Sequence, residues 1–225
     1  MCAIFGYSGF QDKNLITKMS QDQNFRGPDY FDYFTNDKVS IGNNRLSIID
    51  VKHGGQPIFS DDKKFVIVYN GMIYNFNQIR DYLVQKDVKF ETHSDTEVVL
   101  KAYLYWGDKC FNFFDGMWAV CIYDIEKETI ILCRYYMGQK PLYYYHEDEK
   151  FCFSSKSDSI FLCNGLKKEI NKDAIGQYLL YSHIPAPYSL YKKINQVRAG
   201  EIIKYNFSNK KLKKEIYWDL SEGPD

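Results

Sequence analysis

Six segments of the chain combine β-branched and aromatic residues over short runs, with polar residues between them. The segments are Phe65–Asn70, Met117–Asp124, Thr129–Tyr136, Pro141–His146, Lys150–Ser155 and Glu201–Asn206. This pattern predicts β-strands. The polar stretches at 125–128 and 147–149 are short enough for hairpins, so the strands are expected to pair antiparallel.

Helical periodicity occurs in three places: Asn77–Lys86, Ser94–Trp106 and Lys172–Tyr181. Ser94 and Glu97 have the spacing of a capping box, which predicts a helix start at Ser94. Several strands combined with a few long helices predict an α+β domain in which helices cover the outer faces of stacked sheets.

Composition narrows the class of protein. The 225 residues include 29 Lys+Arg and 29 Asp+Glu, so the formal net charge is zero, and 45% of residues are hydrophobic. A neutral chain argues against nucleic acid as a partner, because non-specific binding to a polyanion needs a basic surface. Aromatic residues reach 17%, which suits a β-rich core, although a biased codon composition is an alternative explanation.

The N-terminus has no secretory signal pattern, and the chain contains no apolar run long enough to span a membrane. We therefore expect a cytoplasmic protein. The six cysteines show no metal-ligand or disulfide spacing, so reduced thiols and no metal site are expected. A Lys-rich segment, Asn209–Glu215, is expected to be a solvated turn or hairpin loop, with a docking patch for an acidic partner as the alternative.

Cys2 occupies a chemically special position. A small residue after Met1 normally allows removal of the initiator methionine, which would place an α-amine beside the Cys2 thiol. With ordinary pKa values of about 7.7–8 and about 8.5, the two groups could serve as base and nucleophile. Cysteine also occurs at position two with no such role, so this pattern alone is weak.

Asn70 and Gly71 follow a predicted strand. A side-chain amide and an unobstructed backbone N–H could together form an oxyanion hole, the pair of donors that stabilises a tetrahedral intermediate. Asn-Gly is also the strongest short signal for a hairpin turn. The two residues by themselves leave both interpretations open.

Eleven motifs occur in an order and spacing that resemble the class II glutamine amidotransferase domain, and in particular the N-terminal glutaminase domain of asparagine synthetases. They are MCAIFG, RGPD, RLSIID, GGQP, NGMIYN, SDTE, FDGMWAVCIYD, MGQKPLYY, FSSK, IPAPYSLYKKI and YWDL. The resemblance implies an N-terminal nucleophile hydrolase fold, a four-layer αββα sandwich with two antiparallel sheets. It also implies a glutaminase domain over residues 1–208, with 209–225 as a C-terminal segment leading toward an ATP-dependent synthetase domain.

The resemblance further implies roles for individual residues. Cys2 would be the nucleophile, and Asn70 and Gly71 would form the oxyanion hole. Arg45 would bind the α-carboxylate of glutamine with its guanidinium fork, and Asp95 would bind the α-ammonium, although an acid there also favours the helix dipole. The other residues expected to line the same pocket are Ile48, Ile49 and Met72.

Four positions depart from the family pattern: Ala3 stands for glycine, Met72 for glutamate, Tyr135 for aspartate and Lys156 for glutamate. Met72 lies in the expected pocket and removes one of two acidic partners of the α-ammonium. Because a charged hydrogen bond contributes about 1.5–3 kcal/mol, weak glutamine affinity is expected. Tyr135 and Lys156 are expected outside the pocket, where they would affect the docking of a partner domain.

The implied function is hydrolysis of L-glutamine to L-glutamate and ammonia through a cysteine thioester, without a metal or organic cofactor. ATP and Mg²⁺ would be needed only by a synthetase domain, whose serine-glycine-glycine pyrophosphate loop does not occur here. The expected partners are glutamine and either that domain or a separate ammonia acceptor protein, and homodimer formation is left open. The alternatives are a catalytically degenerate scaffold or regulatory module and another N-terminal nucleophile amidohydrolase. The latter is disfavoured because Arg45 and Asp95 suit a free amino acid.

Overall fold

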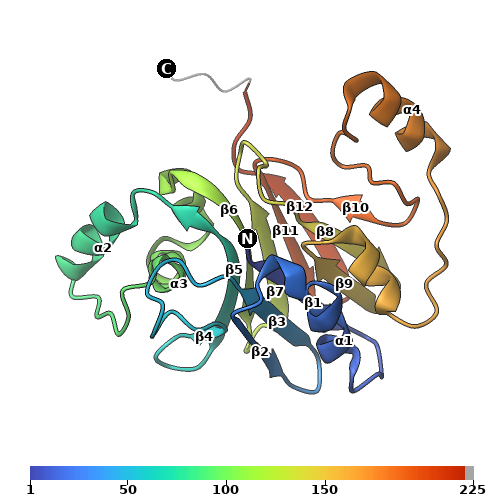
Figure 1. Ribbon diagram of the computed structural model, residues 1–225. Helices are drawn as coiled ribbons and strands as arrows, with labels where there is room; N and C mark the ends of the chain where they lie inside the picture. Colours follow the sequence, from blue (N-terminus) through green and yellow to red (C-terminus); the bar gives the residue numbers. More distant parts are fainter. Residues whose placement is uncertain (221–225) are drawn as a thin grey trace.

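In the computed structural model, which describes residues 1–220, strands form two six-stranded antiparallel sheets (Figure 1). The first sheet has the order β10-β8-β9-β1-β3-β2 and the second the order β12-β11-β7-β6-β5-β4. The strands of the first sheet are β1 (Ala3–Ser8), β2 (Tyr30–Thr35), β3 (Ser40–Arg45), β8 (Tyr143–Glu147), β9 (Lys150–Ser154) and β10 (Asn195–Gln196). Those of the second are β4 (Ile58–Phe59), β5 (Phe65–Ile73), β6 (Gly116–Asp124), β7 (Thr129–Arg134), β11 (Glu201–Asn206) and β12 (Lys211–Ile216).

Helices lie against the outer faces of the two sheets. The α-helices are α1 (Leu15–Asp22), α2 (Phe76–Val84), α3 (Asp95–Trp106) and α4 (Lys172–Tyr181), and the 3₁₀ segments are η1 (Asn24–Arg26), η2 (Gly107–Phe113) and η3 (Ser157–Leu162). Side chains of α2, α3 and η2 pack on the second sheet, whereas those of α1 and η3 pack on the first. The layers are therefore helix, sheet, sheet, helix, as expected, with α4 at one end of the molecule (Figure 1).

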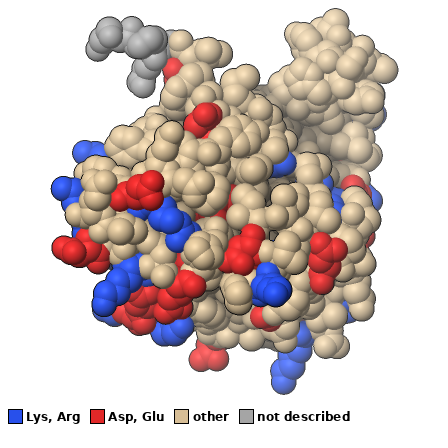
Figure 2. Space-filling view, turned by 60° about the vertical axis from the view of Figure 1, so that its left-hand side comes forward, with Lys and Arg blue, Asp and Glu red and all other residues tan. Residues whose placement is uncertain are grey.

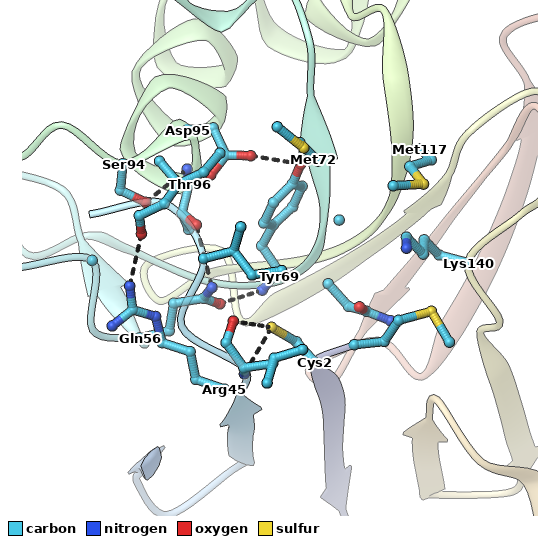
Figure 3. A pocket seen from close by; sticks show the side chains of 17 residues that line it. Cys2, Arg45, Gln56, Tyr69, Met72, Ser94, Asp95, Thr96, Met117 and Lys140 are labelled. Atoms are coloured by element: carbon cyan, nitrogen blue, oxygen red, sulfur yellow. Dashed lines mark hydrogen bonds between the residues drawn. The ribbon is translucent and has the colours of Figure 1, made fainter. Parts of the chain in front are cut away.

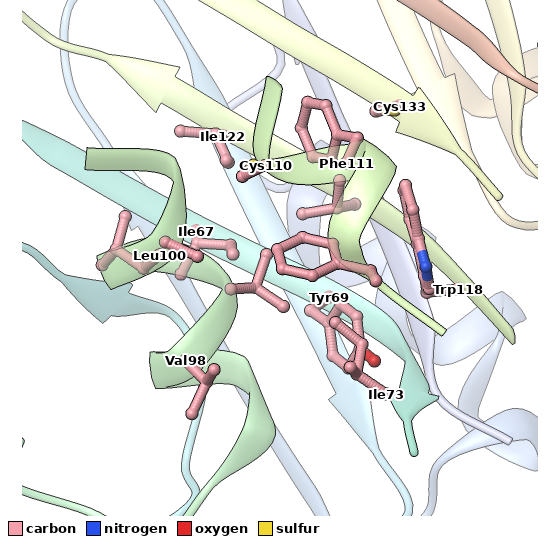
Figure 4. Close-up of a cluster of buried hydrophobic side chains, with 14 of the residues drawn as sticks. Ile67, Tyr69, Ile73, Val98, Leu100, Cys110, Phe111, Trp118, Ile122 and Cys133 are labelled. Atoms are coloured by element: carbon pink, nitrogen blue, oxygen red, sulfur yellow. The ribbon is translucent and has the colours of Figure 1, made fainter. Parts of the chain in front are cut away.

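Alternation of side chains along the strands builds the layers. In β5, Val66 and Val68 point between the sheets, whereas Ile67, Tyr69 and Ile73 point toward α2 and α3, because successive side chains of a strand face opposite sides. Figure 4 shows the helix-side cluster. Both faces of the central strands are buried, which explains why their sequences are apolar throughout rather than alternating.

Each of the six predicted strands and three predicted helices is present, with shifts at the ends. The capping prediction is half right: the Ser94 hydroxyl accepts from the Thr96 N–H at 3.1 Å, but Glu97 does not return to the Ser94 N–H. Its carboxylate instead accepts the N–H groups of Glu91 and Thr92. The loop before α3 is thereby held against the helix.

The Lys-rich segment Asn209–Glu215 was expected to be a turn or hairpin loop, and most of it is instead an edge strand. β12 pairs with β11 over its whole length, from Glu201↔Ile216 to Asn206↔Lys211. Lysine is common on edge strands because it opposes pairing with another chain. The hairpin crosses the predicted domain limit at residue 208, and residues 221–225 of the predicted segment lie outside the described residues.

Charged residues of both signs are interspersed over the lower part of the face in Figure 2, while its upper part is uncharged over a wide area. Acidic and basic residues are thus mixed on this face rather than gathered into separate patches, in a chain whose net charge is zero. No helix within residues 1–220 has the length and apolar character needed to cross a bilayer.

Candidate active site

A cavity of about 180 Å³ opens where the beginning of β1 meets the end of β3, the second half of β5 and the start of α3 (Figure 3). Every predicted site residue lines it: Cys2, Arg45, Ile48, Ile49, Asn70, Gly71, Met72 and Asp95. The fold thus brings together residues from four separate parts of the sequence.

Cys2 is placed by the pairing of β1 with β3. Ala3 lies opposite Asn44, so Cys2 lies beside the end of β3, where the Leu46 N–H donates to Sγ at 3.4 Å. Burial raises the pKa of the Cys2 thiol, and the bond from Leu46 and the charge of Arg45 act in the opposite direction. The thiol faces the cavity, and its backbone carbonyl accepts from Arg26 Nε at 3.2 Å.

Arg45 is buried at one end of the cavity and holds the loop that follows β3. Its Nη2 donates to the carbonyls of Ile49 and Asp50 at 2.9 and 2.8 Å, and its Nη1 donates to Val51 at 3.2 Å. The bidentate fork expected from the sequence is therefore partly committed to the loop. N–H groups on Nε and Nη1 remain for a carboxylate.

Asp95 begins α3 and is also buried. Its Oδ2 accepts from the Tyr69 hydroxyl at 3.1 Å and from the Ile73 N–H at 3.2 Å, so the carboxylate bridges the helix to β5. Burial raises the pKa of Asp95, whereas these two hydrogen bonds lower it. An oriented carboxylate in a desolvated position is suited to bind a cation that enters the cavity.

The edge of β5 carries a row of N–H groups that face the cavity. Trp118 lies opposite Gly71 and its carbonyl accepts from the N–H of Tyr135, the residue after β7, so the Gly71 N–H points away from β6. β4 pairs only with Val66 and Ile67, which leaves this edge open farther along. The N–H of Tyr69 reaches Gln56 Oε1 at 2.6 Å and that of Ile73 reaches Asp95. The Gly71 N–H between them is therefore directed toward the cavity.

Asn70 supplies a second donor from the other face of β5. Its side chain is buried, and Nδ2 has no hydrogen-bond partner among the residues that the structure describes. Buried amides are normally paired, so an unpaired one lining a cavity is a donor held ready for a ligand. Asn70 and Gly71 lie inside β5, which shows that the hairpin-turn alternative is wrong.

Gly71 cannot be replaced by a larger residue without a shift of the sheet. A Cβ atom there would lie 2.5 Å from Cβ of Trp118 and 2.6 Å from the Met117 carbonyl. The glycine therefore allows β5 and β6 to approach closely beside the cavity.

Sequence reasoning missed several residues that line the cavity, and these are Gln56, Tyr69, Ser94, Thr96, Met117 and Lys140. Gln56 and Lys140 occur in the motifs GGQP and MGQKPLYY, which signalled the family but not a role. As expected, Tyr135 and Lys156 are absent from the lining. Ala3 is fully buried in β1, Tyr135 packs against Trp118, and Lys156 pairs with Asp22.

Within residues 1–220 no group of three or more His, Cys, Asp or Glu side chains is arranged to hold a metal ion. The described cavity offers a thiol, a side-chain amide donor, a backbone N–H donor, cations and one carboxylate.

The cavity contains a thiol beside two unpaired donors, with a cation and an anion at one end. Comparison with known protein families gives a match that is consistent with these groups. A model of the glutamine amidotransferase domain matches residues 1–218. The chain belongs to this family. The amidotransferase domain found here accounts for nearly all of the described residues.

Two curated relatives carry the name of a glutamine-hydrolysing asparagine synthetase. The putative asparagine synthetase 2 of Methanocaldococcus jannaschii is 36% identical over 99% of this chain and 47% of its own length. Asparagine synthetase 1 of Bacillus subtilis is 36% identical over 84% of this chain and 30% of its own length. The amidotransferase domain thus spans about half, or less, of the relatives it matches.

A solved structure of glutamine phosphoribosylpyrophosphate amidotransferase from B. subtilis has the same fold, with a TM-score of 0.70 and 19% identity over 96% of this chain and 49% of that one. A second structure, described as an allosteric regulatory enzyme of purine biosynthesis, gives a TM-score of 0.71 and 18% identity. The predicted four-layer fold of an N-terminal nucleophile hydrolase is confirmed.

Proposed function

We propose that this domain hydrolyses L-glutamine to L-glutamate and ammonia through a thioester on Cys2. The observation that carries the proposal is the cavity itself, which the Cys2 thiol, the unpaired Asn70 amide and Gly71 line together with Arg45 and Asp95. A free amino acid has two backbone charges of opposite sign, and this cavity offers one partner for each.

The hydrogen-bonding groups of Arg45 and Asp95 that the protein itself leaves unused indicate how glutamine would bind. The guanidinium N–H groups of Arg45 that the loop leaves unused would bind the α-carboxylate. Oδ1 of Asp95 would bind the α-ammonium, since Oδ2 is occupied by Tyr69 and Ile73. Ile48 and Ile49 line the same end of the cavity. Met72 offers no charge to the ammonium, which supports the expectation of weak glutamine affinity.

The reaction requires a free α-amine on Cys2, and hence removal of Met1. The amine would take the thiol proton while Sγ attacks the carbonyl carbon of the side-chain amide. Asn70 Nδ2 and the Gly71 N–H would stabilise the resulting oxyanion. The C–N bond would then break, with the proton passing from the amine to the leaving nitrogen, so that ammonia departs and a γ-glutamyl thioester remains for hydrolysis by water.

The ammonia acceptor would be a carboxylate activated elsewhere. The relatives' names support an asparagine-synthetase-like amidation by an ATP-dependent domain or a separate protein. In that arrangement ATP and Mg²⁺ would be used by the synthetase part, and the glutaminase step would need no cofactor. A cytoplasmic location fits such a role and stays a prediction, as does homodimer formation.

Glutamate release from glutamine tests the proposal. Cys2→Ala is expected to abolish it, and Cys133→Ala, a buried cysteine outside the cavity, is expected to retain it. Mass spectrometry of the intact protein should show loss of Met1 in the active preparation. Activity in the Cys2→Ala variant, or full activity with Met1 retained, would overturn the mechanism.

Met72 favours a second candidate, a degenerate domain that binds partners without hydrolysing glutamine. Calorimetric titration of Cys2→Ala with glutamine separates the two functions. Stoichiometric binding that is lost in Asp95→Asn supports the glutaminase, whereas absence of binding to both proteins supports the degenerate domain.

A further inference from the structure

Lys140 is a buried cation at the catalytic end of the cavity, and no function discussed so far uses it. Its side chain is only 6% exposed and lines the cavity with Cys2. Figure 3 shows it across the cavity from Arg45 and Asp95, with its ammonium nitrogen turned inward. Within residues 1–220 this ammonium forms no hydrogen bond or ion pair with a side chain. A buried lysine is normally paired, so its position needs a different explanation.

The loop that carries Lys140 is fixed by Arg134 at the end of β7. Arg134 Nε donates to the Lys140 carbonyl at 2.7 Å, Nη2 donates to the Gly138 carbonyl, and Nη1 donates to the Val197 carbonyl at 2.7 Å. Pro141 follows and restricts the backbone further. The backbone from which the Lys140 side chain leaves is thus fixed beside the cavity.

The charges around Cys2 come from all the elements that meet there. The charges that act on its thiol are those of the N-terminal amine, Arg45 of β3 and Asp95 of α3. The charge of Cys2 in turn acts on three further groups: Arg26 of η1, Tyr69 of β5 and Lys140. Arg26 and Arg45 donate to backbone carbonyls, whereas the Lys140 ammonium has no such acceptor among the described groups. Of these three side-chain cations, Lys140 is the one whose charged group forms no hydrogen bond within residues 1–220.

We propose that Lys140 is an electrostatic positioning residue of the glutaminase site, which stabilises the Cys2 thiolate across the cavity. This inference rests on the proposed function and assigns the site a further residue. Burial raises the pKa of the Cys2 thiol and lowers that of Lys140, and each charged form offsets the desolvation of the other. The charge acts through Cys2 and does not require contact with glutamine.

The rate of Cys2 alkylation by iodoacetamide as a function of pH tests this role without glutamine. An opposite charge nearby lowers a pKa by about 1–3 units, so in Lys140→Met the midpoint for alkylation should rise by about one unit or more. Alkylation and kcat/KM at pH 7 should each fall about tenfold. Lys140→Arg, which keeps the charge, should restore the midpoint. The other five cysteines are buried, and Cys2→Ala supplies the blank.

Lys101→Met is the matched control. Lys101 is 5% exposed, lies outside the cavity and pairs with Asp61 at 2.5 Å, so its loss should lower stability without moving the alkylation midpoint. An unchanged midpoint in Lys140→Met, or an equal shift in Lys101→Met, would overturn the proposal for Lys140. Failure of the unmodified protein to release glutamate would instead overturn the proposed function, and the alkylation result is independent of it.

Discussion

Replacing Asn70 with alanine should separate catalysis from stability. Nδ2 of Asn70 is buried without a partner among the described residues, so the amide contributes little to the folded state. A buried unsatisfied donor costs about 1–3 kcal/mol, and its removal offsets part of the packing lost with the side chain. The free energy of unfolding should therefore change by less than about 1 kcal/mol.

Catalysis should respond very differently to the same substitution. Loss of one oxyanion donor raises the barrier by about 2.7–4 kcal/mol, which lowers kcat by about 10²–10³. The Gly71 N–H would remain as an oxyanion donor, so kcat should fall by this factor and not to zero. KM should change little, because the oxyanion develops only after attack.

Asn44→Ala is a control of the same chemistry in the other sheet. Asn44 is fully buried in β3, its Nδ2 donates to the Ser20 carbonyl and its Oδ1 accepts from the Ser20 hydroxyl, both at 2.7 Å. Its removal leaves the buried Ser20 hydroxyl unpaired, while the Ser20 carbonyl keeps only the Gln23 N–H. The free energy of unfolding should therefore fall by about 1–3 kcal/mol, with kcat preserved. Urea denaturation and glutamate release measured on both variants give the comparison. Wild-type kcat in Asn70→Ala, or destabilisation equal to that of Asn44→Ala, would refute the assignment.

Two further predictions concern substrate binding, and a third concerns the pH dependence of stability. Arg45→Lys should raise KM for glutamine about tenfold or more, because lysine cannot both hold carbonyls 49–51 and bind a carboxylate; an unchanged KM in steady-state kinetics argues against this role. Met72→Glu should lower KM by about 10–100-fold by adding a second acid for the ammonium, and a higher KM would contradict that geometry. Burial raises the pKa of Asp95, so its stabilising contribution is present below about pH 3.9 and is lost as pH rises through the folded value. The stability of Asp95→Asn relative to the native protein should therefore increase with pH over that interval in urea titrations, and a constant difference would contradict the shift.

Local apolar patterns were sufficient to predict six of the twelve strands and three of the four α-helices in the described part of the chain. β5, β6 and β7 are buried on both faces, and α3 has a hydroxyl cap that acts locally. Such features depend on neighbours in the sequence, so the sequence specifies them. The motifs around Cys2, Asn70 and Asp95 likewise identified the candidate site.

β3 was missed because its sequence, SIGNNR, is polar although every residue is buried. The hydrogen bonds of its asparagine side chains all go to distant groups: Asn43 Nδ2 donates to the carbonyls of Ala3 and Tyr69, and Asn44 pairs with Ser20. Asn43 Oδ1 has no partner among the described residues. Burial of polar side chains is tolerated where such partners exist. No local pattern predicts partners supplied by β1, β5 and α1.

The sequence by itself determined eight residues of the candidate site, since the motifs fix their identity and order, and all eight line the cavity. Only the tertiary structure decided how their hydrogen bonds are used: the Gly71 N–H is free because β4 ends before it, and Arg45 is shared with its own loop. It also placed Lys140, from a loop fixed by Arg134, across the cavity from the charged pair. These relations depend on contacts between segments far apart in the chain, which form only when the two sheets pack together.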